Sequence, residues 1–274
     1  MRSQVMNADI LQYSMPSAVS NRFCNMDRSP SRTKPAAAPR AVLFDAYGTL
    51  FDVYSVGLLA EQLFPGFGER LAQLWRDKQI EYTRLTSMSG TNGERYRPFW
   101  DLTRAGLRYA ALRLGLALDA SAEDRLMNQY RHLSAFPENR EVLQALKERG
   151  VPAGILSNGD PEMLGVAVKS AGFSGLLAHV LSVHALRKYK TDPAAYALGP
   201  QALNLPAHEI LFVSSNGWDA IGATWYGYTT LWVNRAGLPL EQLDTTPTRT
   251  GTSLRDVLDF FPAPSTASPP EDRP

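Results

Sequence analysis

Residues 41–52 read AVLFDAYGTLFD and contain the first predicted strand and the turn that follows it. Its first five residues form a short apolar run that ends in Asp45, which is typical of a strand covered on both faces. Gly48 and Thr49 follow in a turn that glycine permits easily, so a carboxylate stands at the carboxyl end of a strand with a hydroxyl nearby. Asp45 is therefore a candidate nucleophile that backbone N–H groups can orient. On this stretch alone, Asp45 could equally cap the turn.

Further apolar runs predict strands at residues 152–156, 210–214 and 229–233. Helical stretches separate them, and one runs from Pro137, a favourable first-turn residue, to Gly150, a C-terminal stop. The alternation predicts right-handed crossovers and a parallel sheet with helices on both faces, which is a Rossmann-like α/β core. Ligands should then bind at the carboxyl ends of the strands.

The interval 58–136 interrupts the alternation of strands and helices. It predicts three helices and no strand, the last helix being opened by the capping pattern Ser121-Ala122-Glu123-Asp124. We expect this interval to be an inserted helical cap over the strand ends, with residues 40–57 and 137–261 forming the α/β core. Residues 1–39 and 262–274 lack hydrophobic periodicity and are predicted to be a disordered N-terminal extension and a disordered tail.

The composition excludes several classes of protein. The 274 residues carry 28 Lys and Arg against 27 Asp and Glu, so no global positive charge favours nucleic acid as a partner. No apolar run is long enough for a membrane span, and the N-terminal segment lacks the continuous apolar stretch of a secretory signal, so we expect a cytoplasmic protein. The single cysteine excludes a disulfide framework and a cysteine-based metal cluster.

Three more motifs lie at the end of a predicted strand or just past a crossover. They are Ser157-Asn158-Gly159, Lys190 with Tyr196 six residues later, and Ser214-Ser215-Asn216-Gly217-Trp218-Asp219. Together with the first stretch, and in this order, they resemble the four motifs of the haloacid dehalogenase superfamily, and FDAYGTLFDV is similar to the L-2-haloacid dehalogenases. The resemblance covers roughly residues 40–260.

Leaving-group chemistry separates two activities of this superfamily. Its phosphatases usually carry a second aspartate two residues after the nucleophile as a general acid, and hold Mg²⁺ partly through an acidic fourth motif. Here Tyr47 takes the first place and only Asp219 is charged in the fourth motif, which is a poor oxygen-ligand set for a hard cation. A halide leaves without needing a proton. We therefore predict a dehalogenase with no metal and no cofactor; a Mg²⁺-dependent phosphatase and a catalytically idle binding protein stay open as alternatives.

The resemblance implies hydrolysis of short (S)-2-haloalkanoic acids to (R)-2-hydroxy acids through an ester on Asp45, with inversion at C2. Lys190 would be the cation beside the nucleophile, which agrees with the rule that a cation keeps a carboxylate ionised. Arg76 would draw off the halide, and Thr49, Ser157 and Ser214 would hold the carboxylates of Asp45 and the substrate. The implied catalytic residues are Asp45, Thr49, Arg76, Ser157, Lys190, Tyr196, Ser214, Asn216 and Asp219. The implied halide- and substrate-binding residues are Tyr47, Arg76, Asp77, Phe99, Ser157, Asn158 and Trp218.

Some positions depart from the pattern of these dehalogenases. Asp77 stands where the best-known members have glutamine, Thr191 replaces the usual proline after the lysine, and residues 87–94 form a short insertion. The four histidines match no family position, so the resemblance implies hydrolysis without a histidine base. It also implies a small anionic 2-haloacid and its halide as ligands, and a homodimer.

Overall fold

A computed structural model of the chain describes residues 38–90 and 92–262. The predicted N-terminal extension and tail therefore fall outside the described residues, apart from residues 38, 39 and 262. Within the described part, a parallel six-stranded sheet has the order β3-β2-β1-β4-β5-β6. The strands are β1 (Ala41–Phe44), β2 (Ala153–Ser157), β3 (His179–Ser182), β4 (Ile210–Ser214), β5 (Thr229–Val233) and β6 (Arg249–Gly251).

The middle of the sheet places three sequence motifs at one edge. β1 pairs with β2 on one side and with β4 on the other, so that Phe44 aligns with Ile155 and with Val213. Every residue of these three strands is buried, as their continuous apolar sequences predict. The residues that follow β1, β2 and β4 therefore meet at the carboxyl edge of the sheet, which confirms the expected α/β architecture.

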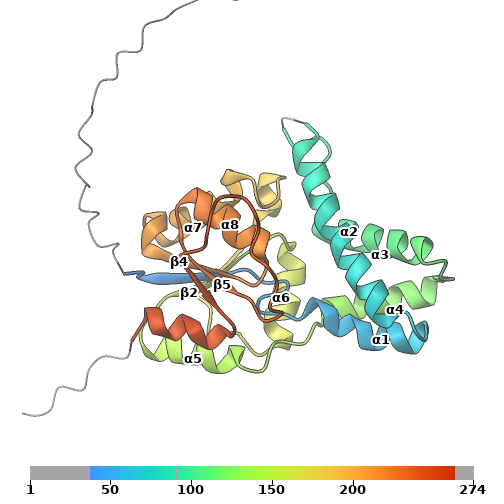
Figure 1. Cartoon of the computed structure of the whole chain (residues 1–274), viewed down its shortest axis with the longest axis horizontal. Coiled ribbons are helices and arrows are strands. Elements are labelled where there is room, and N and C mark those ends of the chain that lie inside the picture. Colours follow the sequence, from blue (N-terminus) through green and yellow to red (C-terminus); the bar gives the residue numbers. More distant parts are fainter. Residues whose placement is uncertain (1–37, 91, 263–274) are drawn as a thin grey trace, which may run out of the picture. The chain divides into compact units, whose positions relative to one another are not determined.

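Helices follow the strands in the predicted alternation. They are α5 (Asn139–Glu148), α6 (Pro161–Ser170), α7 (Pro193–Leu203) and α8 (Gly217–Tyr226), with short 3₁₀ turns at Val53–Ser55, Val183–Leu186, Ala207–Glu209 and Leu254–Phe260. Figure 1 places α5 on one face of the sheet and α7 and α8 on the other. The predicted start at Pro137 is wrong, because Glu138 is the N-cap of α5. Gly150 does follow the helix, with a φ of 69° that ends it as predicted.

Part of the chain between β1 and β2, residues 56–131, forms the α1–α4 segment. Its helices are α1 (Val56–Leu63), α2 (Gly68–Met88), α3 (Phe99–Arg113) and α4 (Ala120–Arg131). The prediction of three helices missed α1, which begins two residues before the expected boundary at 58. The predicted cap at Ser121 is also wrong: the carboxylate of Asp119 accepts the Ala122 N–H, and Ser121 lies in the first turn.

Two helices of the α1–α4 segment approach each other closely. A Cβ atom at Gly106 of α3 would lie 3.3 Å from the backbone N of Gln79 on α2, so glycine allows this approach. The indole of Trp75 donates to the carbonyl of Thr103 at 2.7 Å and fixes the register of α2 against α3. This packing determines where the side chains of Arg76 and Gln79 lie. In the described part of the chain, no helix has the length and apolarity to cross a membrane.

Two strands were not predicted. β3 has only half-buried and exposed residues, and β6 reads Arg-Thr-Gly and is largely exposed. Both are edge strands, where one side of the backbone faces no further strand, so neither needs the apolar run on which the strand prediction relied.

Candidate active site

The carboxylate of Asp45 is oriented by three donors. Asp45 follows β1 directly, and its backbone N–H still bonds to the carbonyl of Val213 on β4. Its Oδ1 accepts from Lys190 Nζ at 3.1 Å, and its Oδ2 accepts from Thr49 Oγ1 at 3.0 Å and from Asn216 Nδ2 at 2.8 Å. The three hydrogen bonds fix the orientation of the carboxylate.

Lys190 connects Asp45 to a second carboxylate. Its Nζ atom is fully buried and lies 3.1 Å from Asp45 Oδ1 and 3.0 Å from Asp219 Oδ2. Its backbone N–H is held by Asn158 Oδ1 at 2.9 Å. Asp219 lies in the first turn of α8 and also accepts the hydroxyl of Tyr196 at 2.8 Å. One ammonium group is thus shared by two carboxylates.

Burial and charge separate the pKa values of this group. Burial opposes protonation of Lys190, but the carboxylates of Asp219 and Asp45 outweigh burial and raise the pKa of the amine. Burial raises the pKa of Asp219 to about 6, although Lys190 acts in the opposite direction. Burial, followed by the nearby charge of Asp219, raises the pKa of Tyr196 well above its ordinary value. Near neutral pH, Lys190 therefore stays a cation, Tyr196 stays a donor, and Asp219 is the group that titrates.

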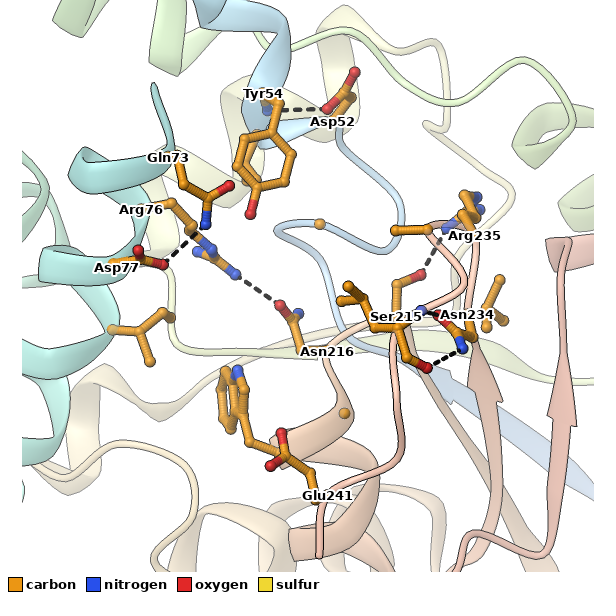
Figure 2. A pocket seen from close by; sticks show the side chains of 18 of the residues that line it. Asp52, Tyr54, Gln73, Arg76, Asp77, Ser215, Asn216, Asn234, Arg235 and Glu241 are labelled. Carbon is orange, nitrogen blue, oxygen red and sulfur yellow. Dashed lines mark hydrogen bonds between the residues drawn. The ribbon is translucent and has the colours of Figure 1, made fainter. Parts of the chain in front are cut away.

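Arg76 reaches the same edge from α2. It is buried, its Nη1 donates to Gln79 Oε1 at 2.7 Å, and its Nη2 donates to the carbonyl of Tyr47 at 2.9 Å and to Asn216 Oδ1 at 3.1 Å. Figure 2 shows the guanidinium pointing to Asn216. Asn216 thus contacts Asp45 with its amide nitrogen and Arg76 with its amide oxygen. Arg76 is not the solvated charge of an amphipathic helix.

Aromatic rings line the site beside Asp45. The ring of Tyr47 is buried, with its centroid 5.5 Å from that of Phe99 and 5.8 Å from that of Tyr130. Burial raises the pKa of Tyr47 well above its ordinary value, so the phenol stays neutral. A Cβ atom at Gly159 would lie 2.6 Å from Tyr47 Cε2, so the ring position requires glycine there.

Two serines predicted to hold carboxylates make other contacts. Ser157 Oγ accepts the N–H of Gly159, and Ser214 Oγ accepts the N–H of Asn216, both at 3.1 Å. They shape the turns after β2 and β4, and of the three predicted hydroxyls it is Thr49 that contacts Asp45. A hydroxyl that accepts a hydrogen bond still has its hydrogen to donate, so each of these buried serines keeps one donor.

A cavity of about 740 Å³ is lined by Arg76 and Asn216 but not by Asp45, and it is called the outer cavity here (Figure 2). Asp77 and Trp218 line this cavity. Asp77 is exposed and accepts from Gln73 at 3.1 Å, and the Trp218 ring lies 5.3 Å below the guanidinium of Arg84. Neither belongs to the group in direct contact with Asp45, so the structure divides the predicted binding residues between an inner site and an outer cavity.

Sequence reasoning missed two functional-site residues. Gln79, fully buried, supports Arg76, and the Arg-x-x-Gln spacing on one helix face was the available signal. Asp160 precedes Pro161 as an N-cap would, yet its side chain does not cap α6. It accepts the N–H groups of Phe99 and Trp100 at 3.0 and 2.8 Å, which ties the start of α3 to the loop after β2. No pattern in the sequence indicates this long-range contact.

Comparison with known proteins identifies the family. Residues 39–227 match the haloacid dehalogenase-like hydrolases. The chain belongs to this family. Within it, the chain is 43% identical over 222 residues to an (S)-2-haloacid dehalogenase from Pseudomonas sp. (strain YL), covering 81% of this chain and 94% of that protein. It is 41% identical to haloacetate dehalogenase H-2 from Moraxella sp. (strain B), covering 76% and 91%.

Solved structures give the same relationship for this haloacid dehalogenase-like hydrolase. The crystal structure of an L-2-haloacid dehalogenase is 63% identical, with a TM-score of 0.80 and coverage of 82% of this chain and 99% of that chain. The L-2-haloacid dehalogenase from Xanthobacter autotrophicus with chloropropionic acid covalently bound is 36% identical, with a TM-score of 0.73 and coverage of 80% and 96%. A phosphatase from Thermococcus onnurineus, at 19% identity and a TM-score of 0.53, shares the fold alone.

Proposed function

We propose that this hydrolase converts short (S)-2-haloalkanoic acids to (R)-2-hydroxy acids through an ester on Asp45. The observation that carries the proposal is the inner site: a buried carboxylate held by three donors, with a neutral tyrosine two residues later and a guanidinium nearby. The relatives named (S)-2-haloacid dehalogenases, and the related enzyme with chloropropionic acid covalently bound, support the same chemistry.

The first step forms the ester. An oxygen of Asp45 attacks C2 from the side opposite the halogen, and the bonding pair of the carbon–halogen bond leaves with the halide, so C2 is inverted. Arg76 receives the halide, with Asn158 and Trp218 as the other proposed halide ligands, and no proton is transferred. Lys190, Thr49 and Asn216 hold the carboxylate for this attack. Preorganisation of this kind removes on the order of 7–11 kcal/mol of barrier in ideal cases.

The second step hydrolyses the ester. Water attacks the carbonyl carbon of Asp45, Asp219 accepts its proton, and Lys190, which lies 3.1 Å from Oδ1, stabilises the negative charge that develops on the carbonyl oxygen. The bond between this carbon and the ester oxygen breaks, that oxygen takes the proton from Asp219, and the hydroxy acid leaves with it. The second proton of the water is released to solvent, which restores the Asp45 carboxylate. C2 is not touched in this step, so the inversion persists in the product.

The surroundings fit a small anionic substrate with an alkyl group. Tyr47 and Phe99 provide apolar walls, and the hydroxyls of Ser157 and Ser214 can bind the substrate carboxylate. We propose that the α1–α4 segment acts as a cap that brings Arg76 to the strand ends, and that substrate enters through the cavity lined by Asp77 and Trp218.

We also propose a homodimer, as the resemblance implies. Apolar side chains on three helices of the α1–α4 segment are highly exposed: Leu58 at 77%, Met88 at 83% and Leu112 at 81%. Single exposed side chains of this kind also occur on monomers, so the homodimer proposal is based on the resemblance. Sedimentation of the full chain at micromolar concentration tests this, and a monomer at all concentrations would contradict it.

A Mg²⁺-dependent phosphatase fits the inner site less well. Asp45 is approached by the ammonium of Lys190 and by an amide N–H₂ of Asn216, and Asn216 in turn contacts the Arg76 cation. In the described part of the chain, no group of three or more His, Cys, Asp or Glu side chains is arranged to hold a metal ion. The residues present therefore offer donors and cations where Mg²⁺ requires oxygen ligands.

Two parallel assays test the proposed activity. The full chain is incubated with (S)- and (R)-2-chloropropionate without added metal, and separately with a panel of phosphate esters and Mg²⁺. We expect chloride release from the (S) acid, and phosphate release without chloride release would refute the proposal. Asp45→Asn keeps the side-chain shape and should abolish turnover. Unchanged turnover in this variant would exclude Asp45 as the nucleophile, and an inactive wild type that still binds the acid would favour the idle binding protein.

A further inference from the structure

We propose that Gln79 is the positioning residue that holds Arg76 in place for the halide. Its neutral amide accepts a hydrogen bond from Arg76 without adding a negative charge that would weaken the attraction between Arg76 and the halide. The proposal rests on the proposed function, because Arg76 is taken there as the group that receives the halide. Gln79 does not touch Asp45 in this structure, so it acts through Arg76.

A closed hydrogen-bond network surrounds Gln79. Its Oε1 accepts from Arg76 Nη1 at 2.7 Å and from the hydroxyl of Tyr130 at 3.1 Å, and its Nε2 donates to Thr103 Oγ1 at 2.6 Å. The hydroxyl of Thr103 in turn donates to the carbonyl of Phe99 at 2.7 Å. Helices α2, α3 and α4 each contribute to the network, and its side chains are buried. Three helices thus fix one amide.

The network determines which way the amide points. Arg76 and Tyr130 both approach Gln79 with donor groups, so an oxygen must face them. The hydroxyl of Thr103 donates its hydrogen bond to the carbonyl of Phe99, so it can only accept from Gln79, and the amide nitrogen must face it. A reversed amide would set donor against donor at Arg76 and acceptor against acceptor at Thr103 in a buried site, where an unsatisfied group is costly.

The two terminal nitrogens of Arg76 have different surroundings. Nη1 is bound on the helical side by Gln79, whereas Nη2 contacts the loops after β1 and β4 through the Tyr47 carbonyl and Asn216 Oδ1. A halide that arrives beside Asp45 can replace the acceptors of Nη2. The contact to Gln79 lies on the other side of the guanidinium and can persist, so it keeps the side chain extended into the site while the other acceptors are exchanged.

The choice of an amide has an electrostatic reason. Glutamate at position 79 could accept the same hydrogen bond from Arg76, but its negative charge would offset the cation that binds the halide. Leucine would leave Arg76 Nη1 and the hydroxyl of Tyr130 without an acceptor. Glutamine accepts both bonds and adds no charge, which suits a site that must bind an anion.

Halide binding by Gln79 variants tests this role. Bromide affinity of the full chain is measured from the ⁸¹Br NMR line width for wild type, Gln79→Leu and Gln79→Glu. Thr103→Val removes the outer support, and Thr83→Val is its matched control: Thr83 is equally buried on α2 but bonds only to the carbonyl of Ile80. Circular dichroism and thermal melting identify the folded variants, and kcat and KM are measured with 2-chloro- and 2-bromopropionate.

We expect Gln79→Leu and Gln79→Glu to weaken bromide binding on the order of ten- to hundredfold. Leucine removes a hydrogen-bond acceptor from Arg76, and glutamate adds a negative charge beside it. The loss in kcat should be larger for the chloro acid, because chloride is the poorer leaving group. Thr103→Val should weaken binding less, and Thr83→Val should leave it unchanged. If Gln79→Leu does not fold, Gln79→Glu and Thr103→Val carry the test.

Two results overturn different claims. Folded Gln79 variants with wild-type bromide affinity and an unchanged ratio of chloro to bromo turnover would refute the role of Gln79 and leave the dehalogenase function intact. A wild-type protein that binds no bromide and releases no halide would refute the proposed function itself.

Discussion

Replacing Lys190 with methionine removes the cation between two buried carboxylates. Nζ lies 3.1 Å from Asp45 Oδ1 and 3.0 Å from Asp219 Oδ2, and the Lys190 side chain is 0% exposed. Methionine keeps an unbranched apolar stem of similar length. Removing one partner of a buried ion pair costs about 3–5 kcal/mol. At roughly 2–4 °C per kcal/mol for a domain of this size, the melting temperature should fall by roughly 6–20 °C.

The stability difference should depend on pH in a defined direction. The pKa of Lys190 is raised above its ordinary value of 10.5, so its contribution is complete below 10.5 and is lost only as the pH rises through the higher value of the folded state. In the variant, the cation that lowers the pKa of Asp219 is gone while burial and the charge of Asp45 still raise it, so Asp219 takes up a proton more readily and this relieves the repulsion between the two carboxylates. The difference in melting temperature between wild type and variant should therefore be largest at pH 8 and decrease towards pH 5.

Thermal melting at pH 5 and pH 8, together with halide release, measures these effects. Lys188→Met is the matched control, because Lys188 pairs with Asp192 at 2.9 Å with a partly exposed side chain and should lose at most about 1 kcal/mol. Halide release by Lys190→Met should fall on the order of a hundred- to thousandfold, as for the loss of an oxyanion donor. Equal melting temperatures for the two variants, or a gap that widens towards pH 5, would refute the account of Lys190.

Three further variants probe other parts of the site. Asp219→Asn should accumulate the ester, which is visible as an adduct in intact-protein mass spectra. In the wild type, ester hydrolysis should slow as the pH falls through about 6, because Asp219 gains a proton there. Hydrolysis at a constant rate from pH 8 to 5 would exclude Asp219 as the base. Asp160→Ala should lower the free energy of unfolding in urea by about 1–2 kcal/mol and also raise KM. Its control, Asp119→Ala, uncaps only α4, so it should lower the free energy of unfolding by the same amount and leave KM unchanged. Equal KM values for the two variants would argue against Asp160 as the residue that ties α3 to the strand ends. Gly159→Ala should displace the Tyr47 ring and reduce kcat/KM at least about tenfold. Its control is Gly165→Ala on α6, where an added Cβ meets nothing within 4 Å, and this change should be neutral or stabilise the protein by at most about 1 kcal/mol. A fully active Gly159→Ala variant would show that the ring position is not critical.

The predicted parts of the fold are those with strong local signals. The strands β1, β2, β4 and β5 are buried apolar runs, and three of them carry a motif at the carboxyl end, so their sequences indicate both the sheet and the site. β3 and β6 are edge strands without such a run, and α1 is a short helix directly after a 3₁₀ turn. The N-cap of α4 was misplaced because Asp119 and Ser121 are both good capping residues, and only the observed contact to Ala122 distinguishes them.

The site was predictable where chemistry dictates residue type. Asp45, Thr49, Lys190, Asn216 and Asp219 lie together, because the first four are at strand ends or in turns and Asp219 is in the first turn of α8, which follows β4 directly. Contacts that depend on how distant helices pack, such as Gln79 with Thr103 or Asp160 with the start of α3, leave no local pattern. The positions of Asp77 and Trp218 in an outer cavity likewise depend on how the α1–α4 segment lies against the loop after β4.

The proposed mechanism requires that Asp45 forms an ester and supplies its own oxygen to the product. A single turnover in ¹⁸O-water, with enzyme in excess over (S)-2-chloropropionate, tests it directly by mass spectrometry of the hydroxy acid and of the peptide that contains Asp45. The ester mechanism predicts ¹⁶O in the new hydroxyl group of the product and one ¹⁸O atom in the Asp45 carboxylate. A first-turnover product that carries ¹⁸O at C2, with Asp45 unlabelled, would contradict the mechanism.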